Sequence, residues 1–393
     1  MARIVASPQR PRAMQNGQAL LALLVILGIG FAAFIYGLVS PASLTLETDK
    51  ITNAALAQAK EALIGYAARD SNRPGSLPCP DTNNNGSAQL FSGSYCPSEI
   101  GRLPWRTLGL PDLRDGGGER LWYAVSRDFS RNPAGAPALN TNTAGQLTIS
   151  GTAPANNVIA IVFAPGLVVG SQVQDTANVN TVANYLEGGN ETSGATTFTT
   201  GAVSATFNDK LLPITTDALF SVVEMRVARE ARAVLQAFYS ANGFFPFANA
   251  YSDTSYQCTN SQQSDRIPRF FTDNCKVDPA DPDWKGVTWP GWFFNNNWHQ
   301  IVFYAVAQKC SKPSSPACSH AAAGMLTVNN MPPPNNDIRA IIITPGRGFA
   351  GQTRPCAAVT DCLEDSENTN GDSVFVKSAI TSTVNDRLVV VAP

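Results

Sequence analysis

The chain carries one sequence pattern twice, and this repeat constrains its fold more than any other feature. Residues 186–211 read LEGGNETSGATTFTTGAVSATFNDKL and align without a gap with residues 363–388, LEDSENTNGDSVFVKSAITSTVNDRL. Every pair of aligned residues in this stretch is 177 positions apart. Upstream, further segments match in the same order: 122–125 with 303–306, 144–149 with 323–328, and 156–166 with 335–346. A repeat of this length predicts one structural unit present in two copies.

Each copy reads as a helix, a long loop and then short β-branched strands. The first helix is expected to start at Thr48 or Asp49, because Pro41 and Ser43 interrupt the preceding apolar run. The second is expected to be capped by Thr216 and Asp217 and to stop at Gly243. The apolar stripe of the first helix is Ile51, Ala55, Leu56, Ala59, Leu63 and Ala67. Strands are expected at 121–125, 146–149, 158–163 and 210–212, and at 301–306, 326–328, 339–343 and 387–391. This order predicts an α+β fold with an antiparallel sheet packed on its helix.

A chain of 393 residues has room for two such domains, each with its own core. We expect a basic leader at 1–17, a transmembrane helix at 18–40, a first domain at 41–213 and a second, repeated domain at 214–393.

The run from residue 19 to residue 39, ALLALLVILGIGFAAFIYGLV, contains no charge. As a helix it would be about 30 Å long, which matches the hydrocarbon core of a bilayer. Three arginines and no acidic residue precede it, and the first acidic residue after it is Glu47, so the positive-inside bias keeps the N-terminus in the cytoplasm. The alternative is a secretory signal that is cleaved near Ser40 to Ser43.

The basic leader ends at Gly17, and Gln18 and the apolar run follow at once. This arrangement resembles the class III signal of type IV pilins and pseudopilins. The resemblance implies cleavage after Gly17 by a prepilin peptidase, methylation of the new N-terminus, and a helix-plus-sheet head. Family members usually carry glutamate at the fifth mature position, where this chain has Ala22. Without that carboxylate a buried terminal ammonium lacks its charge partner, so the resemblance implies a tip or initiating subunit.

These features predict a minor pilin-like or pseudopilin-like subunit of a type IV pilus or type II secretion-type system. It would be a single-pass protein of the inner membrane, with its body in the periplasm or on the cell surface. Its expected partners are other pilin or pseudopilin subunits, the inner membrane and the prepilin peptidase. The alternative is a signal-anchored surface adhesin or binding protein with tandem disulfide-stapled domains, in which Gly17 is not cut.

Charge and reactive side chains argue against two other classes of protein. The net charge is −2, without the basic excess that nucleic-acid binding requires. Two histidines, no GxSxG serine and cysteines expected in disulfides leave no catalytic constellation, so we expect neither an enzyme nor an organic cofactor.

The eight cysteines form four neighbouring pairs: Cys79 with Cys96, Cys258 with Cys275, Cys310 with Cys318, and Cys356 with Cys362. None has the CxxC or Cys/His spacing of a zinc site, so disulfides in an oxidising compartment are favoured over metal. The first two pairs each span 17 residues, and we interpret them as equivalent positions of the repeat.

Two loops have alternating oxygen side chains. In DTNNNG, the residues Asp81, Asn83 and Asn85 with a following glycine imitate the first half of a calcium loop, but the glutamate of the twelfth position is replaced by Ser92. The second loop is DSENTNGD at 365–372. An ordinary turn is the alternative to calcium binding in both.

The second copy has an aromatic-rich stretch that the first copy lacks. Its tryptophans are Trp284, Trp289, Trp292 and Trp298. They predict either an exposed surface that binds a partner or carbohydrate, or a local core; exposure decides between the two.

Overall fold

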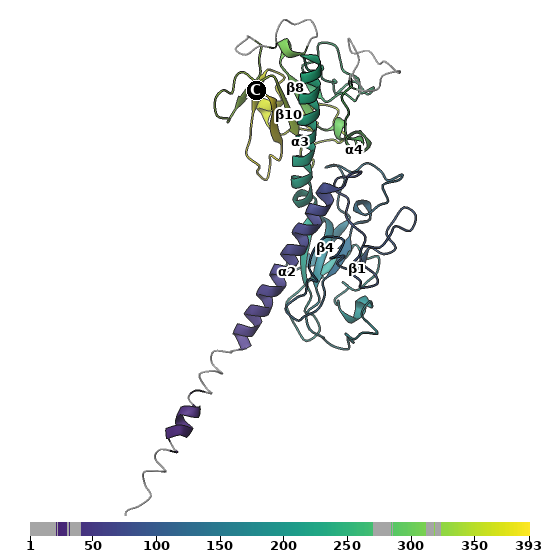
Figure 1. Ribbon diagram of the computed structural model, residues 1–393, viewed down its shortest axis with the longest axis vertical. Coiled ribbons are helices and arrows are strands. Elements are labelled where there is room, and N and C mark those ends of the chain that lie inside the picture. Colours follow the sequence, from purple (N-terminus) through teal and green to yellow (C-terminus); the bar gives the residue numbers. More distant parts are fainter. Residues whose placement is uncertain are drawn as a thin grey trace, which may run out of the picture.

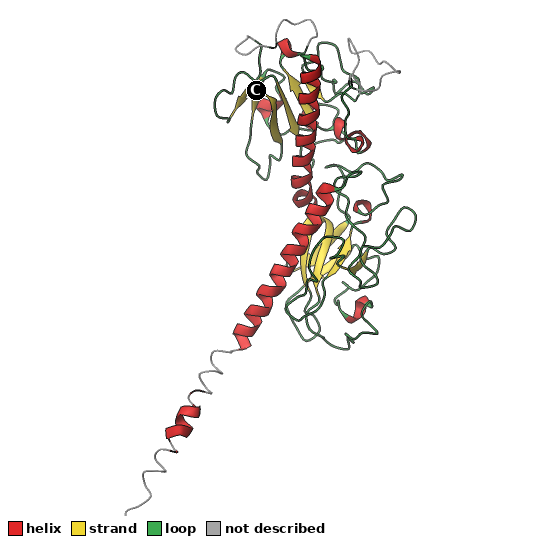
Figure 2. Ribbon diagram, viewed as in Figure 1, coloured by secondary structure: helices red, strands yellow, loops and turns green. Residues whose placement is uncertain are grey.

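The fold is known from a computed structural model that describes residues 21, 23–29, 31, 41–269, 284, 286–311, 318 and 324–393. It is an α+β protein with two lobes stacked along its long axis (Figure 1). Each lobe has one long helix beside a group of strands, as Figure 2 shows. The predicted α+β class is confirmed.

The first long helix, α2, runs over Pro41–Arg69. The expected start at Thr48 or Asp49 is wrong, because the residues from Pro41 onward are already helical. The predicted stripe is buried from Ala55 to Ala67, but Ile51 is 45% exposed. The first half contacts α2 as far back as Asp49, which pairs with Lys210 of β6, whereas the side chains at 45–48 are exposed.

Six strands form the first sheet. They are β1 (Ile100–Arg102), β2 (Trp122–Val125), β3 (Leu147–Gly151), β4 (Ala155–Ala164), β5 (Thr197–Thr200) and β6 (Lys210–Thr215). Their order is β1-β2-β4-β3-β5, with β6 also paired to β4. All pairs are antiparallel except β3 with β5.

The second half repeats this topology. Its strands are β7 (Ser264–Arg266), β8 (Phe303–Val306), β9 (Thr327–Asn329), β10 (Ala340–Thr344), β11 (Val374–Val376) and β12 (Arg387–Ala392). They pair in the order β12-β10-β8-β7, and β9 pairs with β11 in parallel, as β3 does with β5. The short helices are α4 (Gly291–Asn295), α5 (Ser366–Thr369), η1 (Arg127–Phe129), η2 (Val182–Asn184), η4 (Trp298–Gln300), η5 (Gln308–Cys310) and η6 (Val359–Asp361).

The strand register is repeated as well. In the first sheet, Phe163 of β4 pairs with Trp122 and Leu211. At the equivalent position of the second sheet, Ile343 of β10 pairs with the matching residues of β8 and β12. The sequence repeat is therefore a repeat of structure. All eight predicted strands are present, whereas β1, β5, β7 and β11 were not predicted because these three- or four-residue strands have no clear alternation.

The two halves follow one another without a linker. The second long helix, α3 (Thr216–Asn242), begins directly after β6, and the hydroxyl of Thr215 accepts a hydrogen bond from Ala218 N at 3.3 Å. The cap is thus one residue earlier than expected. Gly243 ends the helix in the left-handed region, with φ 76°, as predicted. The expected domain boundary between residues 213 and 214 falls inside β6.

The core runs through both halves. One cluster of buried apolar side chains extends from α2 and the first sheet to α3 and the second sheet. A smaller cluster lies on the other face of the first sheet, with Trp122, Ile161, Phe163 and Phe198 among its members.

The predicted transmembrane run is described only at residues 21, 23–29 and 31, and the basic leader lies outside the described residues. Among the residues that the structure describes, no helix is both long and apolar enough to cross a bilayer.

Candidate functional site

The tryptophans predicted as a partner surface are buried. Trp284, Trp289, Trp292 and Trp298 are 2%, 7%, 5% and 0% exposed. The prediction of an exposed aromatic surface is therefore wrong. The segment from Trp284 to η4 folds its rings inward, and the ring centroids of Trp284 and Trp289 lie 5.0 Å apart in an edge-to-face arrangement.

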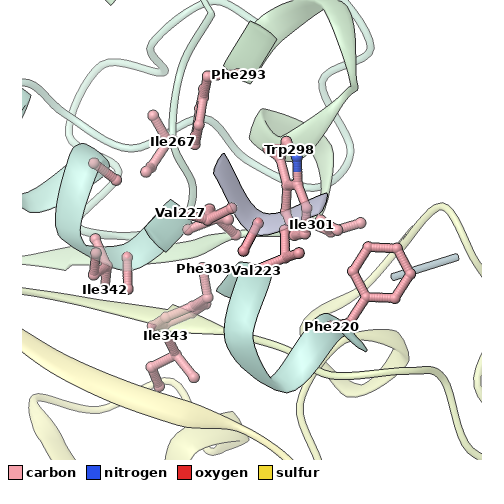
Figure 3. Close-up of a cluster of buried hydrophobic side chains, with 14 of the residues drawn as sticks. Phe220, Val223, Val227, Ile267, Phe293, Trp298, Ile301, Phe303, Ile342 and Ile343 are labelled. Atoms are coloured by element: carbon pink, nitrogen blue, oxygen red, sulfur yellow. The ribbon is translucent and has the colours of Figure 1, made fainter. Parts of the chain in front are cut away.

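The aromatic side chains of the second half meet those of the first at the junction of the two lobes. Phe220 of α3 lies 6.3 Å from the ring of Trp298 and 6.1 Å from the ring of Phe129 in the first half. Figure 3 shows Trp298 beside Phe220, Val223 and Val227, the last three of which belong to α3. The rings of Phe129, Phe220 and Trp298 thus form an apolar contact between the two lobes.

An arginine side chain caps the C-terminal end of α2. Arg226 of α3 donates hydrogen bonds through Nη1 to the carbonyl oxygens of Ala68 and Asp70, at 2.8 and 2.7 Å. Its guanidinium also lies 5.0 Å from the ring of Trp292. A positive charge is favourable at a helix C-terminus, where carbonyl groups are left unpaired. Arg226 therefore joins the C-terminal end of α2 to α3.

Asn296, at the end of α4, links the second half to two segments of the first. Its Oδ1 accepts from Leu139 N at 3.1 Å and its Nδ2 donates to Asn72 O at 3.2 Å. Its own carbonyl accepts from Asn140 Nδ2 at 2.7 Å. The side chain is 3% exposed, so these bonds are shielded from water.

Asn296→Ala is expected to lower the free energy of unfolding by about 1–3 kcal/mol, because the buried Leu139 N–H loses its acceptor. Urea denaturation of the purified chain measures this, with exposed Asn295→Ala as the matched control. Equal stability of the two variants would contradict the role of Asn296 in the junction.

The carboxyl groups of Asp209 and Glu187 form a pair beside the first sheet. Asp209 Oδ2 accepts hydrogen bonds from Glu187 N and Asn190 Nδ2, both at 2.9 Å. Glu187 Oε2 and Asp209 Oδ1 are buried without another partner. Burial and the Glu187 carboxyl raise the pKa of Asp209 to about 9. The two groups are compatible side by side only when one of them keeps its proton.

The second half contains the same pair at the repeated positions. Asp386 Oδ2 accepts from Glu364 N at 2.9 Å, and burial together with Glu364 raises the pKa of Asp386 to about 8. In both halves a glutamine donates to the glutamate, Gln172 at 3.1 Å and Gln352 at 3.0 Å. The gapless alignment contained these residues, but they lie 22 positions apart, and only the fold brings them together.

A cavity of about 330 Å³ lies between the start of α3 and the loops after β10 and β11. Two ion pairs line it: Asp217 with Arg347 at 2.8 Å, and Glu224 with Arg387 at 3.3 Å. Glu224 is 3% exposed, and burial raises its pKa to about 8 although Arg387 opposes the shift. The ion pairs hold the loop after β10 and the start of β12 against α3.

The oxygens of the candidate calcium loop accept backbone hydrogen bonds. Asp81 accepts from Asn83 N at 3.0 Å and from Gly86 N at 2.6 Å, and Asn85 accepts from Ser87 N at 2.8 Å. Within the described part of the chain, no three His, Cys, Asp or Glu side chains gather to hold a metal ion. The loop is a series of turns, and calcium binding by it stays a prediction.

Three of the predicted disulfides are confirmed: Cys79 with Cys96, Cys310 with Cys318, and Cys356 with Cys362. Cys275, the expected partner of Cys258, lies outside the described residues.

The interpretation of the two 17-residue intervals as equivalent is wrong. The backbone of Asp81 pairs with the last residue of β1, and that of Asn249 pairs in the same way with the last residue of β7. Cys79 therefore corresponds to Phe247 and not to Cys258. The equal intervals belong to different parts of the loop.

The described residues of the apolar run are helical and expose their large side chains. Leu21, Leu23, Leu24, Val25, Ile26, Leu27, Ile29 and Phe31 are 51–66% exposed. Soluble surfaces rarely expose so many contiguous apolar groups. The predicted processing residues Gly17 and Gln18 lie outside the described residues.

Comparison with known proteins gives no relative. No family model matches the chain, and neither a curated protein nor a solved structure matches it. Its function is therefore inferred from its own residues and geometry.

Proposed function

We propose that this protein is a non-enzymatic, pilin-like minor subunit of a type IV pilus or type II secretion-type system, anchored in the inner membrane. The observation that carries the proposal is the helix at 23–29 with its exposed apolar side chains. Figure 1 shows it below α2 and clear of both lobes. Such a surface is favourable in lipid and unfavourable in water.

The order of elements supports the pilin-like assignment. An apolar run is followed by α2, whose side chains at 45–48 are exposed and whose later turns pack on an antiparallel sheet. This arrangement resembles a pilin head on its long helix. Ala22, in place of the family's glutamate, supports a tip or initiating position.

The junction supports a display function for the second half. Arg226, Asn296 and Phe220 fix the second lobe to the end of α2, so the tandem heads project as one body. The alternative, an adhesin whose tandem heads and aromatic loop bind a ligand, loses one of these surfaces because the tryptophans are buried.

Complementation of a gene deletion in the source bacterium tests this proposal. Gly17→Val is expected to block leader cleavage and to abolish cross-linking of the subunit to pilin-like proteins of the machine. The neighbouring Asn16→Ala is the matched control and should behave as the wild type. Wild-type protein that cross-links to no pilin-like subunit would contradict the proposal.

A further inference from the structure

The loop after the central strand differs in chemistry between the two halves. After β4 it carries Leu167 and Val168, which are 67% and 54% exposed. After β10 the equivalent positions are Arg347 and Gly348. The same loop on the same fold is thus apolar in the first half and charged in the second.

In the first half this loop lies against the turn at 115–118, which in turn contacts α2. Gly166 N donates to Asp115 Oδ2 at 2.8 Å, and a Cβ at Gly117 would be 3.3 Å from Leu167 Cδ2. The adjacent Gly116 N donates to the Thr52 hydroxyl of α2 at 2.9 Å. Asn208 holds the loop by donating to Leu167 O at 2.6 Å.

A further exposed apolar side chain of the first half is Val203, which is 72% exposed. Val203 is the counterpart of Ile380, which lines the cavity beside Arg347 in the second half. Because Arg347 is the counterpart of Leu167, the repeated fold places Val203 near the loop after β4. We call Leu167, Val168 and Val203 the apolar patch.

Two ion pairs lie near the described start of α2. Lys50 pairs with Glu47 at 3.8 Å, and Lys210 pairs with Asp49.

The patch lies close to the proposed membrane. Thr48 is nine residues beyond Val39, a helical rise of about 14 Å. The headgroup layer adds roughly 5–7 Å to each side of the hydrocarbon core. Transmembrane helices tilt by about 20° on average and by up to about 40°. Figure 1 shows loops of the first half reaching down to the level at which α2 begins, so a tilted anchor brings them to the headgroups.

We propose that the apolar patch inserts into the lipid surface and fixes the tilt of the tandem heads on the membrane. This inference rests on the proposed membrane anchor. Lipid is favoured as the occupant because the loop is apolar only in the half that follows the anchor, and because binding to a lipid surface strengthens with the apolar area that is buried.

Full-length protein in lipid nanodiscs tests the insertion. Leu167→Trp adds a fluorophore to the patch, and Arg347→Trp places one in the equivalent loop of the second half as the matched control. Wild-type emission, measured in parallel, is subtracted as the background of the buried tryptophans. Lipids brominated on their acyl chains quench only tryptophans that enter the bilayer.

The expected result is a blue-shifted emission for Leu167→Trp that brominated lipid largely quenches, with no such loss for Arg347→Trp. Unquenched Leu167→Trp in a protein that co-elutes with nanodiscs would overturn the insertion while leaving the anchor intact. A blue shift that depends on protein concentration and not on bromine would mean that a second copy covers the patch, and would also overturn it. Failure of the wild type to enter nanodiscs would refute the anchor itself.

Discussion

Leu24→Asp combined with Leu27→Asp should release the protein from the membrane fraction. Each charge near the centre of a spanning helix costs about 2.5–3.5 kcal/mol by insertion measurements, so two charges make insertion of this run unfavourable. Sedimentation after alkaline carbonate extraction measures the effect, with the wild type in the pellet and the double variant in the supernatant.

The control for this experiment places the same two charges on the body of the protein. Leu90→Asp with Ile380→Asp alters side chains that are 86% and 47% exposed, and this variant should stay in the pellet. A helix variant that still sediments with membranes would show that the apolar run is not what holds the chain there.

The stability of the folded body should fall as the pH rises from about 5 to about 9. The pKa values of Asp209, Asp386 and Glu224 are raised to about 9, 8 and 8, mainly by burial. A raised folded-state pKa stabilises the fold fully below the unfolded value near 4, and this contribution is lost as the pH passes the folded value. Because each unit by which a folded-state pKa exceeds the unfolded one corresponds to about 1.4 kcal/mol, the loss should lower the urea midpoint measurably.

Urea denaturation at a series of pH values measures this dependence. Asp209→Asn with Asp386→Asn removes two of the three titrating groups and keeps an oxygen acceptor at each position, so the pH dependence should become weaker, with the part due to Glu224 left. The exposed Asp175→Asn should leave the wild-type slope unchanged. A double variant with the wild-type slope would mean that the carboxyl pairs do not share a proton.

The repeat made the sheets predictable. Each central strand is a β-branched run with a matching copy, so Val158 to Phe163 and Arg339 to Ile343 could be located without a structure. The helix stop at Gly243 was predictable because glycine adopts the left-handed conformation that ends a helix. Strands such as β7, with the sequence SDR, have no such pattern and form because β8 provides a partner.

The junction could not be predicted from local sequence. Arg226 caps a helix that ends more than 150 residues earlier, and Asn296 binds segments at comparable separations. Clustered tryptophans look alike in sequence whether they face solvent or a second lobe. Only the packing of η4 against α3 places Trp298 in the core.

The carboxyl pairs could not be predicted from the sequence for a related reason. Glu187 and Asp209 stand in loops rich in Asn, Gly and Thr, where acidic residues are usually solvated. The fold closes both loops over the sheet and removes the carboxyl groups from water, and the second copy repeats the arrangement.

The N-terminal residue of the membrane-bound protein tests the pilin-like assignment most directly. Mass spectrometry of the chain extracted from its own bacterium should give a mass that starts at Gln18 with one added methyl group. A chain that starts at Met1, or one cut after the apolar run near Ser40 to Ser43, would contradict the assignment.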